Sequence, residues 1–237
     1  QMLPSLLNKL SRIKDPRNPN KTKHKMTVLL LYGMLMFVYQ IGSRRETNRT
    51  MSRILFENLQ AIFPELESLP HADTLARLLE TINVSKIQDC MVELIKDLIR
   101  RKKFQTYLYK KNFLIAVDGT QKFYRNWQWD DKCLERTVGG ETKKEQYYVY
   151  VLESVLILGN GITLPLFSEF LTNRDWKKGE SKQDCELRAF YRLAKKIKES
   201  FRNTRITIVA DGLYACGPVI ETCLKNKWGY MIVLKED

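Results

Sequence analysis

Two apolar runs of strand length, each ending in an Asp-Gly pair, constrain the fold of this chain more than any other feature. The first run, FLIAVDGT, reaches Asp118-Gly119, and the second, ITIVADGLY, reaches Asp211-Gly212. Their length, β-branched content and glycine stops are typical of buried strands. A carboxylate at the carboxyl end of a strand lies where open α/β sheets bind ligands. We therefore expect a sheet that carries both Asp residues at a binding edge.

The two Asp residues also suggest a metal site. Carboxylates buried side by side are costly unless a cation compensates their charge. Oxygen ligands of this kind suit Mg²⁺ or Mn²⁺. A single Asp-Gly pair is readily explained as a turn that ends a strand, but the repetition favours a shared site. We predict that Asp118 and Asp211 bind a divalent ion.

The order of the predicted elements brings these two positions together. From residue 112 onward the chain alternates between strand and helix patterns, and an Asn-Gly turn marks a hairpin between the second and third strands. The predicted strands are 113–117, 147–158, 162–170, 206–210 and 230–234, and the helices are 184–201 and 214–225. This is the order of an α/β, ribonuclease-H-like fold with a mixed sheet. In that fold the first and fourth strands are neighbours.

The region before the strands has helical spacing. Residues 1–103 are expected to form a helical N-terminal region, a candidate for DNA binding, and residues 112–237 the ribonuclease-H-like core. Asp73 and Ser85 are expected to cap two of these helices. Two helices with a tight turn between them resemble a helix-turn-helix, although plain bundle packing explains the pattern equally well.

An apolar run at 27–41 raises the question of a membrane. It has 15 residues, short of the roughly 20 that span a bilayer, so we predict a buried helix and no membrane partner. The five cysteines form no CxxC pair, which favours reduced thiols in a cytoplasmic, nucleoid-associated protein. With only two histidines, zinc-protease chemistry is excluded and histidine triads are disfavoured.

The charge predicts a polyanionic partner. Forty Lys and Arg oppose 27 Asp and Glu, giving a net charge of +13, which favours double-stranded DNA and binding that weakens steeply with salt. Trp127 and Trp129 are expected either to stack on unpaired bases or to cover the sheet edge. Asp130 and Asp131 beside them are expected to be solvated. The candidate DNA-binding lysines are Lys143, Lys144, Lys195, Lys196 and Lys198, and Lys177-Lys178 is a further basic pair.

Several of these segments together resemble a known family. AVDGT, LPLFSEFL after the hairpin, KQDCE and VADGLYA are similar to segments of DDE transposases of bacterial insertion sequences, of the IS-four type. DPR at 15–17 and LPHADTLARLLE resemble regions upstream of such catalytic domains. The resemblance implies that Asp118 and Asp211 are catalytic and use two Mg²⁺ or Mn²⁺ ions. It also implies that transposon ends and target DNA are the partners, with a possible homodimer on DNA.

The chain departs from the family at the third carboxylate. The resemblance implies a later Glu in a Tyr-x2-Arg-x3-Glu-x6-Lys signature, yet the 26 residues after Asp211 in this chain of 237 contain none. We therefore expect a chain truncated before the catalytic Glu and inactive in strand transfer. Glu186 is the alternative metal ligand. Glu169 is expected to be structural, and Asp184 to cap the following helix.

Two alternatives to a transposase follow from the same residues. A site completed by Glu186 would favour a ribonuclease-H-like metal-dependent nuclease that cuts without joining strands. The helices and basic patches are equally consistent with a non-catalytic DNA-binding remnant of a transposase. Metal-dependent nicking separates the enzymes from the remnant, and strand joining separates the transposase from the nuclease.

Overall fold

The computed structural model describes residues 2–50, 53–139, 143–172 and 184–234. It divides into two compact units, residues 1–94 and 95–237, and the division falls inside one helix. Met51, which we expected on a helix, the Lys177-Lys178 pair and the first two residues of KQDCE lie outside the described residues. The two units are described separately below.

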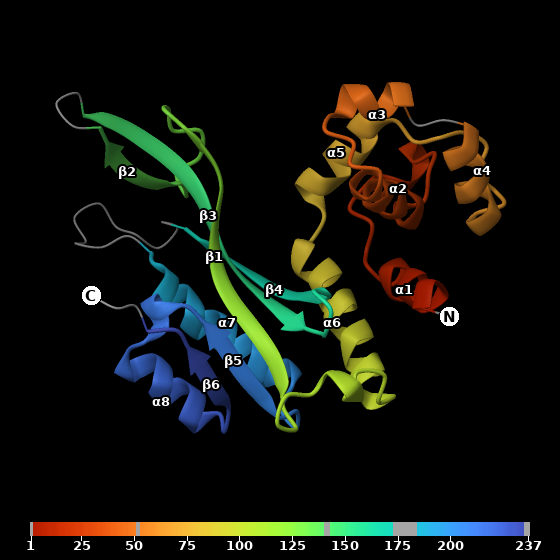
Figure 1. Cartoon of the computed structure of the whole chain (residues 1–237). Coiled ribbons are helices and arrows are strands. Elements are labelled where there is room, and N and C mark those ends of the chain that lie inside the picture. Colours follow the sequence, from red (N-terminus) through yellow and green to blue (C-terminus); the bar gives the residue numbers. More distant parts are fainter. Residues whose placement is uncertain (1, 51–52, 140–142, 173–183, 235–237) are drawn as a thin grey trace. The chain divides into compact units, whose positions relative to one another are not determined.

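The first unit is helical throughout its described residues, as predicted (Figure 1). Its core collects apolar side chains from successive helices, and Leu29, Leu59 and Leu78 are completely buried. The elements are α1 (Met2–Ser11), η1 (Pro19–Lys21), α2 (Met26–Val38), α3 (Arg44–Thr50), α4 (Arg53–Ile62), α5 (Ala72–Thr81) and α6 (Val84–Arg100), the last of which carries the division between the units.

Helix α2 accounts for the apolar run, but only part of it is buried. Residues 26–33 are buried, whereas Phe37 exposes 86% of its surface and Val38 exposes 70%. The prediction of a buried helix over the whole run is therefore corrected for its last turn. Within the described residues, no helix has both the length and the apolar character that crossing a bilayer requires.

Two expected helix caps are wrong. The N-cap of α5 is His71, whose Nδ1 accepts a hydrogen bond from the backbone N–H of Asp73 at 3.3 Å. Before α6, Asn83 Oδ1 accepts from the backbone N–H of Ser85 at 3.1 Å. Asn83 therefore provides the capping hydrogen bond that we expected from Ser85. In both cases the acceptor lies two residues before the predicted cap. A short polar side chain there satisfies an otherwise unpaired helix N–H.

The second unit is built on a six-stranded mixed sheet (Figure 1). Its strands run in the order β2-β3-β1-β5-β6, and β4 pairs with β3. With β2 set aside, this is the ribonuclease-H-like arrangement, so the predicted fold class is confirmed. β2 was not predicted. The strands are β1 (Phe113–Arg125), β2 (Leu134–Val138), β3 (Lys144–Ile157), β4 (Thr163–Leu171), β5 (Ile206–Ala210) and β6 (Gly229–Ile232).

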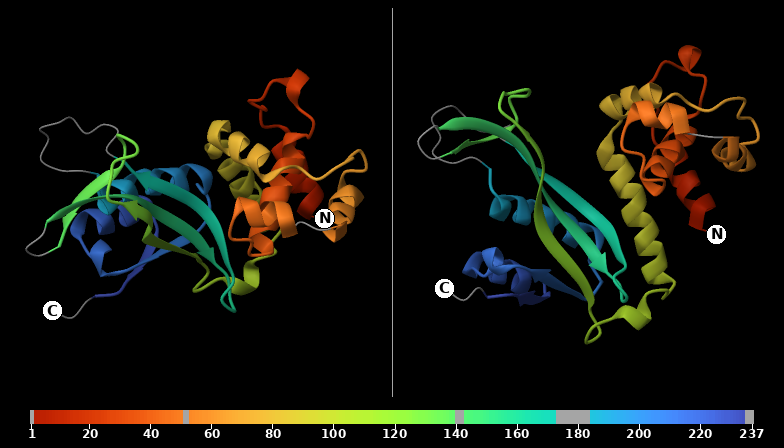
Figure 2. Two further views of the ribbon diagram at one scale, coloured as in Figure 1. Left: turned by 90° about the horizontal axis from the view of Figure 1, so that it is seen from above. Right: turned by 45° about the horizontal axis from the view of Figure 1, so that its top comes forward.

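β1 and β3 are longer than the strands predicted at 113–117 and 147–158, and they extend beyond β5 and β6 (Figure 2). β1 pairs antiparallel with β3 along its whole length, with a β-bulge between Gln121 and Phe123. The predicted hairpin between β3 and β4 is present. Asn160 and Gly161 both have positive φ, as its tight turn requires.

Two helices follow the hairpin. α7 (Glu186–Ser200) packs on β4 and β3, α8 (Gly217–Lys225) packs on β6, and the two helices contact each other. The sheet face that carries Ile115, Leu152 and Ile208 is almost fully buried. α8 begins three residues later than predicted, because Gly212–Tyr214 forms the short 3-10 helix η3. A further 3-10 turn, η2 (Gln105–Tyr107), precedes the sheet.

Candidate active site

The parallel pairing of β1 and β5 places the two predicted aspartates at matching positions. The paired register ends with Ala116 opposite Val209. Continued by two residues, this register sets Asp118 opposite Asp211 on the same face of the sheet, with the strands about 4.8 Å apart. Both residues are exposed. β1 and β5 are adjacent strands, as predicted, and a shared site for the two carboxylates remains a prediction.

Asp118 does not end its strand, which corrects the sequence interpretation. β1 continues for seven residues beyond it to Arg125, because β3 keeps pairing with β1 after β5 has stopped. Asp118 Oδ1 accepts a hydrogen bond from the N–H of Gly119 at 2.9 Å. Directly across the antiparallel pair lies Glu153, whose carboxylate is 3.1 Å from Lys122 Nζ.

Asp211 follows the last residue of its strand, as predicted. It is the N-cap of η3, and its Oδ1 accepts from the backbone N–H of Leu213 at 3.0 Å. The carboxylate is therefore fixed by local backbone geometry. For this Asp-Gly pair, the interpretation as a strand-ending turn holds together with its position beside Asp118.

A third carboxylate, that of Glu186, reaches the same part of the sheet from the first residue of α7. Its Oε1 accepts from the hydroxyl of Tyr150 at 2.7 Å, and its Oε2 accepts from the hydroxyl of Tyr214 at 2.9 Å. A Cβ at Gly119 would lie 2.7 Å from Glu186 Oε2 and 2.6 Å from a ring carbon of Tyr150. Glu186 thus packs against the backbone beside Asp118, and only glycine leaves room for it.

The two phenols are held in their protonated form. Burial, followed by the hydrogen bond to Glu186, raises the pKa of Tyr214 and of Tyr150 well above the usual range. The charge of Asp118 contributes to both shifts, and that of Asp211 contributes to the shift of Tyr214. The charges of Glu186, Asp211 and Asp118 all raise the pKa of Tyr214, and Glu186 is the one of the three that contacts its hydroxyl.

The carboxylates are not gathered as a ligand shell. Within the described ranges, no group of three or more His, Cys, Asp or Glu side chains is placed to hold a metal ion. Each oxygen of Glu186 accepts one hydrogen bond from a tyrosine. Asp118 and Asp211 offer hard oxygen ligands of the type that Mg²⁺ and Mn²⁺ prefer. Metal binding remains a prediction.

Glu169 and Asp184 belong to an ion-pair network with two basic residues of α7. Arg192 lies 2.6 Å from Glu169 and 2.7 Å from Asp184, and Lys196 also pairs with Glu169. Glu169 is therefore structural, as expected. Asp184 accepts from the N–H of Thr172, whereas the N-cap of α7 is Cys185, without a side-chain cap. Asp184 is therefore not the N-cap of α7, and its carboxylate accepts from the N–H of Cys185 at 3.0 Å while it pairs with Arg192.

The candidate DNA-binding lysines fall into two groups. Lys143 and Lys144, at the start of β3, and Lys195 on α7 are exposed. Lys196 pairs with Glu169, and Lys198 Nζ donates to the carbonyl oxygen of Asn226 at 3.0 Å. The last two lysines thus have intramolecular partners that their sequence pattern did not reveal.

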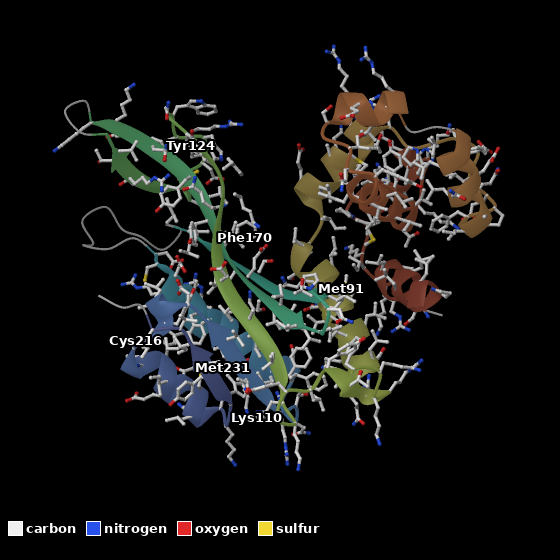
Figure 3. All side chains as sticks on the ribbon, in the orientation of Figure 1. Met91, Lys110, Tyr124, Phe170, Cys216 and Met231 are labelled. Carbon is white, nitrogen blue, oxygen red and sulfur yellow. The ribbon has the colours of Figure 1, made fainter. Side chains whose placement is uncertain are left out.

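The two tryptophans belong to an aromatic and cationic cluster at the projecting end of β1, where Figure 3 marks Tyr124. Trp129 packs on Phe123 with ring centroids 5.2 Å apart. The guanidinium of Arg125 lies 4.8 Å from the ring centroid of Trp127 and 5.4 Å from that of Trp129. Trp129 therefore covers the end of the strand, whereas Trp127 remains 57% exposed. Asp130 and Asp131 are exposed, as expected.

Sequence reasoning missed Tyr150 and Tyr214. Each reaches Glu186 across a long stretch of chain, 36 and 28 residues respectively. No spacing rule joins such distant positions. The one local signal was the glycine after Asp118, which we interpreted as a turn. A glycine inside a strand also marks a point where another group approaches the backbone closely.

Comparisons with known proteins found one family model, which matches the helical part of the chain. Residues 7–95 match a family model described as DDE_Tnp_1-associated. No curated protein matches the chain. Among solved structures, a piggyBac transposase synaptic complex with hairpin DNA is similar at 13% identity and a TM-score of 0.45, covering 100% of this chain and 51% of that one. A Mos1 transposase paired-end complex with the left transposon end has 13% identity and a TM-score of 0.28, covering 92% and 60%. The chain thus spans about half of the first protein and three-fifths of the second.

Proposed function

We propose that this chain is the core of a DDE transposase of the insertion-sequence, IS-four type, with Asp118 and Asp211 as its catalytic aspartates. The observation that carries the proposal is the parallel pairing of β1 with β5, whose register ends two residues before each aspartate and supports matching positions for them. The match of residues 7–95 to a transposase-associated family model supports it independently. So does the net charge of +13, which favours a DNA partner.

In this proposal Asp118 and Asp211 hold the metal ions, Mg²⁺ or Mn²⁺. When bound, the ions supply the charge that stabilises the attacking and leaving oxygens of an in-line phosphodiester displacement. The cap geometry of Asp211 keeps one ligand fixed before any ion arrives. Tyr150 and Tyr214 hold Glu186 against the backbone of β1 at Gly119, the residue after Asp118. Such preorganisation matters because small errors in position strongly lower the rate.

DNA is the proposed partner, through the double-stranded ends of an element and its target. The exposed lysines at the start of β3 and the cluster of Arg125 with Trp127 offer phosphate and base contacts, respectively. If about six phosphates are contacted, affinity for a duplex falls roughly a thousandfold between 50 and 200 mM salt. A homodimer on DNA stays part of the same proposal.

A ribonuclease-H-like nuclease is the second candidate, and the position of Glu186 favours it. A carboxylate from the first turn of α7, packed against Gly119, completes a set of three acidic residues without any later signature. Both candidates need the same aspartates. They differ in whether a DNA 3′-hydroxyl, rather than water, attacks the phosphodiester bond.

Cleavage of a labelled duplex by the purified chain in Mn²⁺ tests the shared part of both candidates. We expect nicking that Asp118→Asn abolishes. Asp131→Asn is the matched control, because it removes the same charge from an exposed loop of the same unit. Joining of a pre-cut donor end to a supercoiled target then distinguishes transposase from nuclease. Duplex binding without any metal-dependent nicking would reject both enzymes and leave a DNA-binding protein.

A further inference from the structure

A pocket in the helical unit lies at the amino end of α2, far along the chain from the carboxylates. Its volume is about 570 Å³, and it opens between the end of α1, the DPR segment and the start of α2. The lining residues used below are Asp15, Arg17, Thr22, Lys23, Met26 and Thr27. Most of its polar groups are hydrogen-bond donors or cations. The pocket therefore has the character of an anion site.

The amino end of α2 is buried and uncapped. Its N-cap residue, Lys25, makes no side-chain capping hydrogen bond. In the described part of the chain, the backbone N–H groups of Met26 and Thr27 have no hydrogen-bond acceptor, although both residues are more than nine-tenths buried. A helix end that is buried without partners is unusual. The aligned peptide dipoles also make this end attractive to negative charge.

Thr27 gives an independent indication of a ligand. Its side chain lines the pocket, and the residue exposes only 9% of its surface. Its hydroxyl makes no hydrogen bond with any residue that the structure describes, whereas the neighbouring Thr22 hydroxyl donates to the carbonyl oxygen of Asn18 at 2.8 Å. A buried hydroxyl without a partner destabilises the fold. A bound acceptor would satisfy it.

The charges around the pocket are predominantly positive. Arg17 uses Nε and Nη2 to bind Asp15 and the carbonyl oxygen of His24, which leaves both N–H groups of Nη1 for another acceptor. Asp15 is neutralised by that bidentate pair. Lys25 forms an ion pair with Glu65, with Nζ 2.6 Å from the carboxylate oxygen. Lys23 is exposed and has no ion pair among the described side chains, so Lys23 and Arg17 supply the available positive charge.

We propose that this pocket binds a phosphate group at the amino end of α2. The first-turn N–H groups and the Thr27 hydroxyl would donate to its oxygens, while Arg17 and Lys23 balance its charge. Phosphate suits the site because it offers several acceptor oxygens to donors that converge from one helix end and two side chains. The inference goes beyond the proposed catalytic function and does not depend on it.

The test uses inorganic phosphate as the probe and the full chain as the protein. At constant ionic strength set with chloride, phosphate should shift the amide NMR signals of Met26 and Thr27. Thr27→Val and Lys23→Gln should each weaken phosphate binding about tenfold, because each removes one contact to a charged group. Lys21→Gln is the matched control, since Lys21 is an exposed lysine two residues away that does not line the pocket.

Unfolding measurements with and without phosphate check that the variants fold and give a second test. Without phosphate, Thr27→Val should be at least as stable as the natural chain, because it removes an unpaired buried hydroxyl. With saturating phosphate, it should be less stabilised than the natural chain. Unmoved amide signals, or equal losses in Lys21→Gln and Lys23→Gln, would overturn the proposal. Asp118→Asn should leave phosphate binding intact, which keeps this test separate from the catalytic one.

A labelled duplex identifies the source of the phosphate. If Lys23→Gln weakens duplex binding more than Lys21→Gln does, the group is a phosphate of the DNA backbone. If the two variants bind duplex equally while phosphate binding still distinguishes them, the site takes free phosphate or a small phosphorylated molecule. Either result supports the pocket, and each assigns it a different ligand.

Discussion

The two Asp-Gly pairs have the same sequence and different structures. Asp118-Gly119 lies in the middle of a 13-residue strand, where the glycine gives room to Glu186 and Tyr150. Asp211-Gly212 leaves its strand at once, and the aspartate caps a 3-10 helix. In the first pair the glycine provides space for neighbouring side chains, and in the second the aspartate accepts a hydrogen bond from the backbone. The same dipeptide therefore has two different structural roles.

The partners of each strand explain the difference. β1 has β3 beside it as far as Arg125, so its backbone groups remain paired after Asp118. β5 pairs with β1 as far as Val209 and with β6 as far as Ala210, over four residues each. A strand continues as long as a neighbour satisfies its backbone. The length of the neighbour, rather than the Asp-Gly sequence, determines where each strand stops.

The largest effect is expected on metal binding, where the two pairs should behave alike despite their different structures. Asp118→Asn and Asp211→Asn should each abolish Mn²⁺ binding measured by calorimetry, because each removes an anionic ligand from a small set. Asp131→Asn should bind as the natural chain does. If only one of the two variants loses binding, the matched register of β1 and β5 does not produce a shared site.

The next largest effect is expected on stability, because the glycine of the first pair is closely packed. Gly119→Ala should lower the free energy of unfolding by about 1–3 kcal/mol, because its Cβ would overlap Tyr150 and Glu186. Gly217→Ala is the control, since a Cβ there meets nothing within 4 Å, and its change should stay within about 0.5 kcal/mol. Urea denaturation measures both. Equal effects would mean that Glu186 does not approach the strand so closely.

A smaller difference in unfolding free energy is expected between the two aspartates, because they make different hydrogen bonds to the backbone. Asp211→Ala removes the acceptor for Leu213 N–H, which costs about 0.5–2 kcal/mol for a helix cap. Asp118→Ala removes only a bond to the adjacent Gly119 N–H. We therefore expect Asp211→Ala to lower the unfolding free energy more than Asp118→Ala does, and urea denaturation measures both. Asp118→Ala being the more destabilising variant would contradict this assignment.

The smallest effect concerns the tyrosine that follows the second pair. Because burial and Glu186 raise the pKa of Tyr214, the folded chain keeps a proton that an unfolded tyrosine loses above about pH 10. The folded state then binds more protons, so the unfolding free energy should fall as pH rises beyond 10. Tyr214→Phe should reduce that slope, by at most about 1.4 kcal/mol per pH unit.

Denaturation at pH 9, 10 and 11 measures this slope. Tyr124→Phe serves as the control, because Tyr124 is 56% exposed and distant along β1 (Figure 3). An unchanged slope in Tyr214→Phe would show that the phenol titrates normally.

Much of the fold was predictable, because periodic patterns act locally. The apolar runs at β1 and β5 and the Asn-Gly turn between β3 and β4 specified strands and a hairpin without any long-range information. β2 was missed because its five residues include three that are exposed, so it lacks the alternation of a half-buried strand. Its position depends on pairing with β3, which a local pattern does not encode.

The candidate site was predictable only in part. The strand order correctly made β1 and β5 neighbours, but the sequence pattern did not show that β1 continues past Asp118. Other contacts of the site join residues many positions apart. These are the hydrogen bonds of Glu186 and the ion pairs of Lys196 and Asp184. Such contacts depend on the packing of α7 against the sheet. A sequence pattern names the helix but not the partners of its side chains.

The bulge in β1 has a consequence for the side of the sheet that the tryptophans occupy. Side chains alternate along a strand, and one extra residue reverses that alternation. Because the register shifts between Gln121 and Phe123, Phe123 and Arg125 lie on the same face as Asp118, where an unbroken strand would turn them to the other. Deleting Lys122 would remove the bulge and leave Phe123 and Arg125 on this face, because Phe123 would then follow Gln121 directly and keep Val149 as its partner. β1 therefore presents Asp118, Phe123 and Arg125 on one face of the sheet.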